Sequence, residues 1–327
     1  MTVTPPPFDP ELAVVLELNP ESTTVLTPEL IPLAREVMAR QRPTDQEIRR
    51  QGTFTFEERE VPGPAGAPAV SLLICRPAGA PRPSSARLPA LYCVHGGGMV
   101  SGDNRLGILD RLDLAHELGG LVVVSVEYRL APEHPHPAPV EDCYAGLVWT
   151  ARHARELGID RDRIFVVGSS AGGGLAAALA LMARDRGGPE PAGQFLMAPM
   201  LDDRNNSPSS HQMAGVGTWD RASNHTGWSA LLGDRMGKPG VSPYAAPARA
   251  TDLSGLPPMY IEVGSAETFR SENVDYASRI WMAGGRAELH VWPGGFHGFH
   301  GDAPKTRITR DVKEARLRWM RRTLATL

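Results

Sequence analysis

The sequence predicts an α/β protein with a mostly parallel sheet and helices on both faces. Two observations carry this prediction: short apolar runs recur along the chain, and helical patterns separate them. A third is the composition, with 42% hydrophobic and 22% charged residues, which is typical of a folded globular protein. A chain of 327 residues is long enough for one large domain with a small accessory part.

Eight segments have the apolar character of strands. The first segment alternates apolar and polar residues, the second is a continuous apolar run, and a turn separates them. An antiparallel pair is therefore expected there. The later runs are separated by helical patterns, which is typical of parallel strands. The expected strands are 53–60, 69–76, 90–94, 121–128, 163–168, 193–199, 257–264 and 286–292.

The helices are recognised by their period and by the glycines that end them. Three of them, 141–157, 173–186 and 270–283, each stop at a glycine. A last helix is expected from residue 309 to the end of the chain. An earlier one is expected at 27–41, where Thr27 can cap the helix and a proline follows.

Charge and cysteine content exclude several classes of function. A net charge of −3 gives no basic surface for nucleic acid or anionic membranes. Three cysteines with apolar neighbours fit neither a metal pair nor a disulfide framework. The longest apolar run, 175–182, is too short to span a bilayer, and the N-terminus lacks the cationic region of a secretory signal. We expect a cytoplasmic protein with a small-molecule partner.

The segment GSSAGG at 168–173 raises the possibility of a nucleophile. It places Ser170 between a β-branched apolar run and a helix-forming run. A nucleophilic serine of this kind needs a strand, a tight turn and a helix, with glycines on both sides. Gly168 and Gly172 lie two positions from the serine. The alternative is a small-residue turn that packs a helix on the sheet.

The sequence HGGG at 95–98 follows the expected strand 90–94 directly. Consecutive glycines leave backbone N–H groups unobstructed, as the stabilisation of an oxyanion requires. A phosphate-binding loop is the competing interpretation. However, no Gly-Lys-Ser/Thr follows, and no GxGxxG pattern is present. The loop is therefore predicted to bind an oxyanion.

Four motifs in this order resemble the hormone-sensitive-lipase-like esterases, the bacterial family IV branch of the α/β-hydrolases. The motifs are HGGG (95–98), YRLAPEHPHPAPVEDC (128–143), GSSAGGG (168–174) and FHGF (296–299). The resemblance implies an α/β-hydrolase fold with an eight-stranded sheet and a small helical cap. It implies N-terminal cap helices in 1–50 and a catalytic domain in 51–327, whose insertion 202–250 contributes to the cap and pocket.

The resemblance also implies roles around the nucleophile. Ser170 would attack the substrate, and the backbone N–H groups of Gly97, Gly98 and Ala171 would hold the oxyanion. His95 would hold the glycine loop in place rather than transfer a proton.

The chain departs from the family pattern beside the nucleophile. Ser169 stands where the family usually has an aspartate, which puts the loop contacts in question but removes no catalytic atom. Four residues of the second motif are expected to shape the loop and helix behind the site: Tyr128, Arg129, Glu133 and Asp142.

A serine hydroxyl needs an imidazole base, and ten histidines are available. The FHGF match selects His297, in a loop after the last expected strand. His290 lies within that strand and is expected to be structural, and His300 is the nearby alternative. His134 and His136 lie in a proline-rich loop without other ligands, so no metal site is expected there.

The imidazole needs a carboxylate, which in this fold comes between the serine and the histidine in the chain. Aligning ETFRSE with the family pattern Asp-Pro-Leu-Arg-Asp-Glu places Glu267 at the catalytic acid. Glutamate is one methylene longer than aspartate, so its loop must lie further back. The other candidates are Glu272, Asp275 and, within the strand, Glu262.

These residues predict a serine carboxylesterase that acts on short- to medium-chain esters through an acyl-enzyme, without cofactor or metal. The alternatives are the same triad acting on an amide, formamide or lactone, and a non-catalytic ligand-binding module. The resemblance implies a homodimer that forms through the last strand. Five apolar residues are candidates for the pocket or for cap core: Met99, Met213, Trp219, Trp228 and Phe296.

Overall fold

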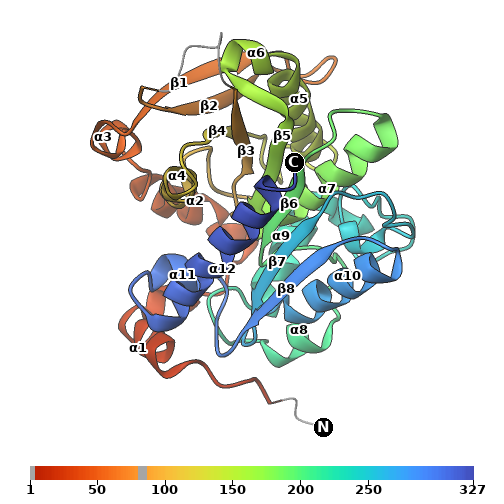
Figure 1. Ribbon diagram of the computed structural model, residues 1–327. Helices are drawn as coiled ribbons and strands as arrows, with labels where there is room; N and C mark the ends of the chain where they lie inside the picture. Colours follow the sequence, from red (N-terminus) through yellow and green to blue (C-terminus); the bar gives the residue numbers. More distant parts are fainter. Residues whose placement is uncertain (1–3, 80–86) are drawn as a thin grey trace.

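An eight-stranded sheet runs through the molecule, with helices on both faces (Figure 1). The structure is a computed structural model and describes residues 4–79 and 87–327. It confirms the predicted α/β class and all eight predicted strands. The strands are β1 (Phe54–Val61), β2 (Val70–Pro77), β3 (Leu88–Val94), β4 (Val122–Glu127), β5 (Ile159–Ser169), β6 (Gly193–Met197), β7 (Met259–Gly264) and β8 (Ala287–Trp292).

The strand order is β1-β2-β4-β3-β5-β6-β7-β8. Strand β2 pairs antiparallel with β1, as expected for the opening of the chain, and it also pairs antiparallel with β4. The remaining pairs are parallel. The carboxyl ends of β5, β7 and β8 therefore lie along one edge of the sheet, where ligands bind in open parallel sheets.

Both faces of the central strands are buried, which explains their continuous apolar runs. In β3, Tyr92 packs in the core cluster on one face, and Leu91 and Cys93 pack in the cluster on the other. The first cluster includes residues of helices α5, α7 and α10, and the second includes residues of α4 and α12. Two layers of helices thus enclose the sheet.

Twelve α-helices lie within residues 4–79 and 87–327. They are α1 (Pro10–Leu18), α2 (Ile31–Arg40), α3 (Asp45–Ile48), α4 (Ile108–Glu117), α5 (Ala138–Arg152), α6 (Ala154–Leu157), α7 (Ala171–Arg186), α8 (Pro208–Gln212), α9 (Arg221–Leu232), α10 (Arg270–Met282), α11 (Phe299–Asp302) and α12 (Arg307–Leu324). Short 3₁₀ turns occur at Pro20–Thr23, Pro28–Leu30, Arg50–Gly52, Gly233–Arg235 and Pro247–Arg249.

Three helix predictions need correction. The segment 27–41 opens with a 3₁₀ turn, and Thr27 makes no side-chain capping bond, so the α-helix begins only at Ile31. The segment 141–157 divides at His153 into α5 and α6, and α5 begins three residues earlier, at Ala138. The last helix begins two residues earlier than expected, at Arg307.

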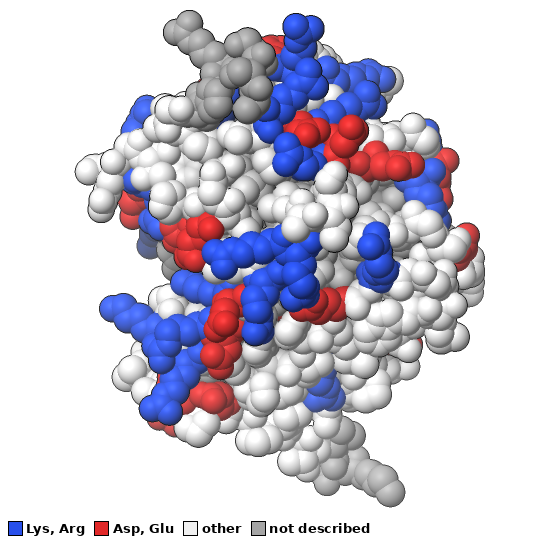
Figure 2. Space-filling view, in the orientation of Figure 1, with Lys and Arg blue, Asp and Glu red and all other residues white. Residues whose placement is uncertain are grey.

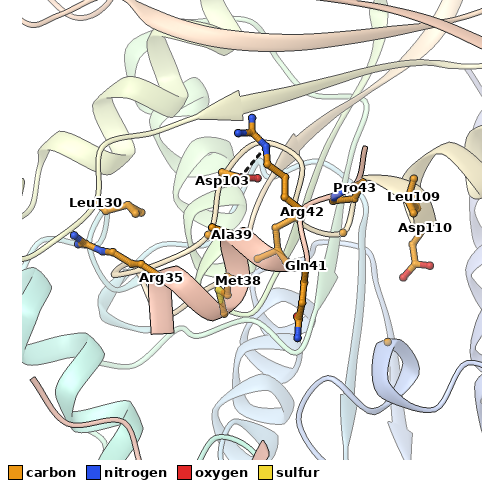
Figure 3. A pocket seen from close by; sticks show the side chains of 14 residues that line it. Arg35, Met38, Ala39, Gln41, Arg42, Pro43, Asp103, Leu109, Asp110 and Leu130 are labelled. Carbon is orange, nitrogen blue, oxygen red and sulfur yellow. Dashed lines mark ion pairs between the residues drawn. The ribbon is translucent and has the colours of Figure 1, made fainter. Parts of the chain in front are cut away.

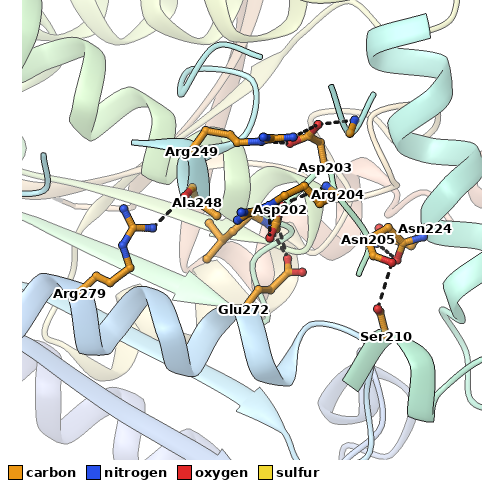
Figure 4. A network of polar contacts seen from close by, with 12 residues as sticks. Asp202, Asp203, Arg204, Asn205, Ser210, Asn224, Ala248, Arg249, Glu272 and Arg279 are labelled. Carbon is orange, nitrogen blue, oxygen red and sulfur yellow. Dashed lines mark hydrogen bonds and ion pairs between the residues drawn. The ribbon is translucent and has the colours of Figure 1, made fainter. Parts of the chain in front are cut away.

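The N-terminal segment and the insertion 202–250 contact each other. The backbone N–H of Leu26 donates to the hydroxyl of Ser223, and the hydroxyl of Thr226 donates to the carbonyl of Leu26. Within the insertion, Asp203 pairs with Arg249 at 2.7 Å, and Glu272 of α10 links the insertion to the core by accepting the backbone N–H of Asp202 (Figure 4). The assignment of both segments to a cap stays a prediction.

The three cysteines are free and buried, as predicted. No helix within the described ranges is long and apolar enough to cross a membrane. Figure 2 shows Lys and Arg side chains gathered over α12 with Asp and Glu between them. Charges of both signs thus share this face.

Candidate active site

Ser170 lies in the tight turn between β5 and α7. Its backbone has φ 56° and ψ −123°, which is strained for a residue with a side chain. A Cβ on Gly168 would collide with the backbone of Gly172, and a Cβ on Gly172 would collide with the carbonyl groups of Val94 and His95. The two glycines therefore permit the turn that lifts the serine out of the sheet.

The structure brings the three predicted side chains together at the carboxyl edge of the sheet. Nε2 of His297 lies 2.9 Å from Oγ of Ser170. Nδ1 of the same imidazole lies 3.5 Å from Oε1 of Glu267, and neither of these two atoms has another hydrogen-bond partner among the described residues. Glu267 follows β7 and His297 follows β8, so adjacent strands set the spacing.

The other candidate acids have different partners. Both carboxylate oxygens of Glu262 are engaged, one by Arg316 and the other by the hydroxyl of Tyr260 and the indole of Trp292. Asp275 is exposed on α10.

Glu272 is the remaining candidate acid. It is buried and accepts the backbone N–H groups of Leu201 and Asp202 (Figure 4). Burial raises the pKa of the Glu272 carboxyl well above its usual value, although both backbone bonds lower it. This residue anchors the start of the insertion and does not contact the imidazole of His297.

The other histidines near the site are engaged elsewhere or buried. His290 bonds to Glu288 at 2.9 Å and stacks on Trp292 in β8. Burial, together with the nearby positive charges of two arginines, lowers the pKa of the His300 imidazole well below its usual value. No group of three or more potential metal ligands occurs in the part of the chain that the structure describes.

Three backbone N–H groups lie free beside the serine. Gly97 and Gly98 belong to the loop after β3, and Ala171 is the first residue of α7. No backbone hydrogen bond among the described residues uses these N–H groups. Positive φ values of 104° and 64° at Gly97 and Gly98 explain why the loop needs glycine. Free donors at a helix N-terminus suit a developing negative charge.

His95 and Tyr128 hold this loop from behind. Their rings stack at 4.0 Å, and the hydroxyl of Tyr128 donates to the carbonyl of His95 at 2.9 Å. Nδ1 of His95 lies 2.8 Å from the carbonyl oxygen of Gly96. Burial lowers the pKa of His95 to about 4, so the imidazole is neutral at pH 7.

The YRLAPE loop is fixed by two arginines. Arg129 and Asp142 form a two-fold ion pair, in which the Asp142 carboxylate is buried. Arg35 of α2 pairs with Glu133 and also donates to the carbonyl groups of Val100 and Ala131. These contacts of Arg35 join α2 to the loops that follow β3 and β4.

Part of the insertion lies across the site. The hydroxyl of Thr218 donates to the carbonyl of His297 at 2.6 Å, and the hydroxyl of Thr268 donates to the carbonyl of Trp219 at 2.5 Å. The indole of Trp219 packs so closely on Gly98 that a Cβ there would collide with it. The sequence offered Trp219 only as a pocket candidate, and nothing in its pattern indicated the role of Thr218.

A cavity of about 350 Å³ contains the Oγ of Ser170. Its lining includes Gly97, Gly98, Trp219 and His297, and also the half-buried Ser169. The other four pocket candidates do not line it: Met99 and Trp228 lie in the main core, Phe296 lies in a small third cluster, and Met213 is buried. The cavity is of a size suited to a small molecule.

Figure 3 shows a second cavity, of about 340 Å³, which shares part of its lining with the first. Helix α2 forms one wall, and an ion pair between Arg42 and Asp103 at 3.3 Å lies on another. Met38, Leu106 and Asp110 line both cavities.

Comparison with known proteins places this geometry in a family. Residues 91–301 match the family model described as alpha/beta hydrolase fold. Carboxylesterase NlhH of Mycobacterium tuberculosis is 35% identical over 91% of this chain and 90% of its own. The chain belongs to the α/β-hydrolases, in their hormone-sensitive-lipase-like esterase branch. This confirms the resemblance inferred from the four motifs.

Other relatives of this α/β-hydrolase agree in length and shape. Esterase LipI of M. tuberculosis is 38% identical over 68% of both chains. Among solved structures, a bacterial heroin esterase has a TM-score of 0.87 and 36% identity, covering 97% of this chain and 98% of its own. Esterase LipW of Mycobacterium marinum has a TM-score of 0.85 and 32% identity, with 99% of both chains covered.

Proposed function

We propose that the protein is a serine carboxylesterase that hydrolyses short- to medium-chain esters through an acyl-enzyme. The observation that carries the proposal is the 2.9 Å separation between the Ser170 hydroxyl and Nε2 of His297, beside three free backbone N–H groups. A hydroxyl next to an imidazole is the arrangement that acyl transfer requires. The names of the relatives LipI, NlhH and LipW, all esterases, support the same chemistry.

In the proposed mechanism His297 removes the proton of Ser170 as the oxygen attacks the ester carbonyl. The N–H groups of Gly97, Gly98 and Ala171 hold the oxyanion. The imidazolium then donates its proton to the alcohol, which leaves. Water repeats the two steps on the acyl-enzyme and releases the acid. No cofactor or metal ion takes part.

Glu267 holds the imidazole in the tautomer that carries its proton on Nδ1. The 3.5 Å distance between the Glu267 carboxylate and Nδ1 is longer than a hydrogen bond, and such bonds often tighten only when substrate is bound. The carboxylate is buried and its Oε1 atom has no other partner in the described residues. It therefore remains available to the imidazolium during the reaction.

The proposal is tested with chromogenic esters of increasing acyl length. The wild-type protein is expected to prefer short to medium chains, and Ser170→Ala is expected to lose several orders of magnitude in turnover while it keeps its fold. Labelling by a fluorophosphonate should require Ser170. An unlabelled wild-type protein would indicate a binding module, and faster turnover of matched amides or lactones would indicate the other chemistry.

Two further parts of the proposal concern assembly and location. We propose a homodimer that forms through β8, which lies at the edge of the sheet with Val291 exposed, next to the exposed Trp281 and Met282 of α10. Light scattering at micromolar concentration tests it, and a monomer would contradict it. The cap assignment of residues 1–50 and 202–250 and the cytoplasmic location stay predictions.

A further inference from the structure

Helix α4 carries an arginine within its buried stripe. Ile108, Leu112 and Ala115 are buried at the helical spacing i, i+4 and i+7, and Arg111 occupies position i+3 of the same stripe. Arg111 is only 8% exposed to solvent. Arginine is rarely buried to this extent without a partner, because an isolated charge is poorly solvated in the interior.

The guanidinium of Arg111 has no partner within residues 4–79 and 87–327. It forms no hydrogen bond, and the carboxylates of Asp110 and Glu262 attract it only over a longer range. The buried carboxylate nearby, that of Glu262, is engaged by Arg316, Tyr260 and Trp292. Its charge is therefore already matched by Arg316.

The other groups around Arg111 form no ion pair with it. Burial raises the pKa of the Cys93 thiol to about 12, so this thiol is neutral. His300 is neutral as well, because burial lowers the pKa of its imidazole. Asp110 and Asp302 line the same cavity, but neither forms an ion pair with Arg111. Among the described residues, the Arg111 guanidinium therefore has no directly bonded counter-ion, although Asp110 and Glu262 attract it at longer range.

This charge lies on the wall of the catalytic cavity. Arg111 lines the same cavity of about 350 Å³ as Ser170 and His297. The planar fork of a guanidinium binds a carboxylate with two parallel hydrogen bonds. A ligand anion in the cavity would supply the counter-ion that the protein itself lacks.

We propose that Arg111 is a specificity-determining residue that binds a carboxylate carried by the ester substrate. The proposal rests on the esterase function proposed above and names the substrate class: an ester with a second, anionic end. The carboxylate can belong to the acyl part, as in a monoester of a dicarboxylic acid, or to the alcohol part. The chemistry that Arg111 recognises is the same in both cases.

A competing explanation is that Arg111 serves only the fold. Its side chain also borders a smaller space of about 70 Å³ lined by Asp113, Glu117, Lys313 and Arg316. Solvent in that space could satisfy the guanidinium without any ligand. In this case removal of the charge would affect neutral and anionic substrates alike.

The first test compares matched esters in a pH-stat. Monomethyl glutarate and methyl pentanoate differ by a carboxylate in the acyl part, and 4-acetoxybutanoate and butyl acetate differ by one in the alcohol part. Arg111→Met is expected to lower kcat/KM for at least one anionic ester by about 10- to 100-fold, and for its neutral partner by less than about 3-fold. Whichever pair responds identifies the source of the carboxylate.

Two variants control this comparison. Arg111→Lys keeps the charge without the fork and should retain part of the preference. Arg50→Gln removes a positive charge that pairs with Asp113 on α4 but does not line the catalytic cavity, so it should leave the ratio of anionic to neutral turnover unchanged. An unchanged ratio in Arg111→Met, or an equal fall for both esters of each pair, would overturn the proposal.

The second test measures binding without turnover. In a Ser170→Ala background, monomethyl glutarate or 4-acetoxybutanoate should raise Tm, and Arg111→Met should abolish this rise. Arg111→Met alone should not lower Tm, since it removes an uncompensated charge from an apolar stripe. If neither of the two anions raises Tm, the carboxylate site is contradicted. Failure to hydrolyse even the neutral esters would instead contradict the esterase function, and the binding test would still apply.

Discussion

The hydroxyl of Thr218 donates a hydrogen bond of 2.6 Å to the carbonyl oxygen of His297. The next residue, Trp219, accepts a hydrogen bond from Thr268, which follows Glu267 directly. One short segment of the insertion is thus bonded to the loop of the proposed base and to the loop of the proposed acid. These two bonds link the insertion to both loops and so fix the spacing between them.

Replacing Thr218 with valine keeps its shape and removes the hydroxyl. We expect kcat to fall by about 2- to 10-fold with little change in KM, because a single neutral hydrogen bond that orients His297 is lost. Steady-state kinetics on a short-chain ester measure this. The matched control is Thr226→Val in α9, which removes the hydrogen bond from the Thr226 hydroxyl to the carbonyl of Leu26. An equal loss of kcat in both variants would argue against a specific positioning role.

The assignment of the acid is tested by exchanging carboxylates for amides. Glu267→Gln should lower kcat by about 10³- to 10⁴-fold, because the amide no longer favours the required tautomer or stabilises the imidazolium. Glu272→Gln should mainly reduce stability, since that side chain bonds to the backbone of the insertion. Circular dichroism and thermal unfolding separate the two effects. The reverse pattern would make Glu272 the acid.

Trp219 lines the cavity beside Gly98, where we expect it to limit the length of the acyl chain. Trp219→Ala removes this wall, so the preferred acyl chain should lengthen by several carbons, with activity on acetate esters reduced. A series of 4-nitrophenyl esters from acetate to decanoate measures the shift. Trp281→Ala, on the exposed face of α10, should keep the wild-type profile. An unaltered profile in Trp219→Ala would mean that the acyl group binds elsewhere.

The sheet could be predicted from sequence because burial on both faces leaves a simple signal. Runs such as 121–128 and 257–264 contain almost only apolar residues, and each became a central strand. The ends were less predictable. Strand β5 starts at Ile159, four residues before the expected run, because Ile159 pairs with Leu88 of β3 ahead of an irregular polar stretch at 160–163. Pairing with a neighbour decided this boundary, and no local pattern encodes it.

Some site residues could likewise be predicted from a local sequence pattern, and others could not. Ser170 and His297 stand in motifs whose local geometry is part of the signal. Thr218 could not be identified, because its partner lies 79 residues away and its own neighbourhood has no period. Arg111 belongs to no motif, but its position on α4 indicates that it is buried. A charge at position i+3 of the stripe formed by Ile108, Leu112 and Ala115 is visible in the sequence once α4 is recognised.

The buried imidazole of His95 gives the protein a specific dependence of stability on pH. Its pKa is lowered by burial to about 4, against about 6.5 in an unfolded chain. Between these values the unfolded state binds more protons, so the free energy of unfolding falls as the pH falls. The loss attributable to His95 between pH 7 and pH 5 is about 2 kcal/mol.

A non-titrating variant isolates this contribution. Burial raises the pKa of Glu127 to about 7, so this carboxyl acts in the opposite direction and stabilises the fold as the pH falls through the same range. His95→Gln leaves Glu127 in place. Urea unfolding at pH 5, 6 and 7 should therefore show that the free energy of unfolding of the variant, taken relative to that of the wild type, rises by about 2 kcal/mol between pH 7 and pH 5. Parallel curves for the two proteins would mean that His95 is protonated as readily in the folded state as in the unfolded one.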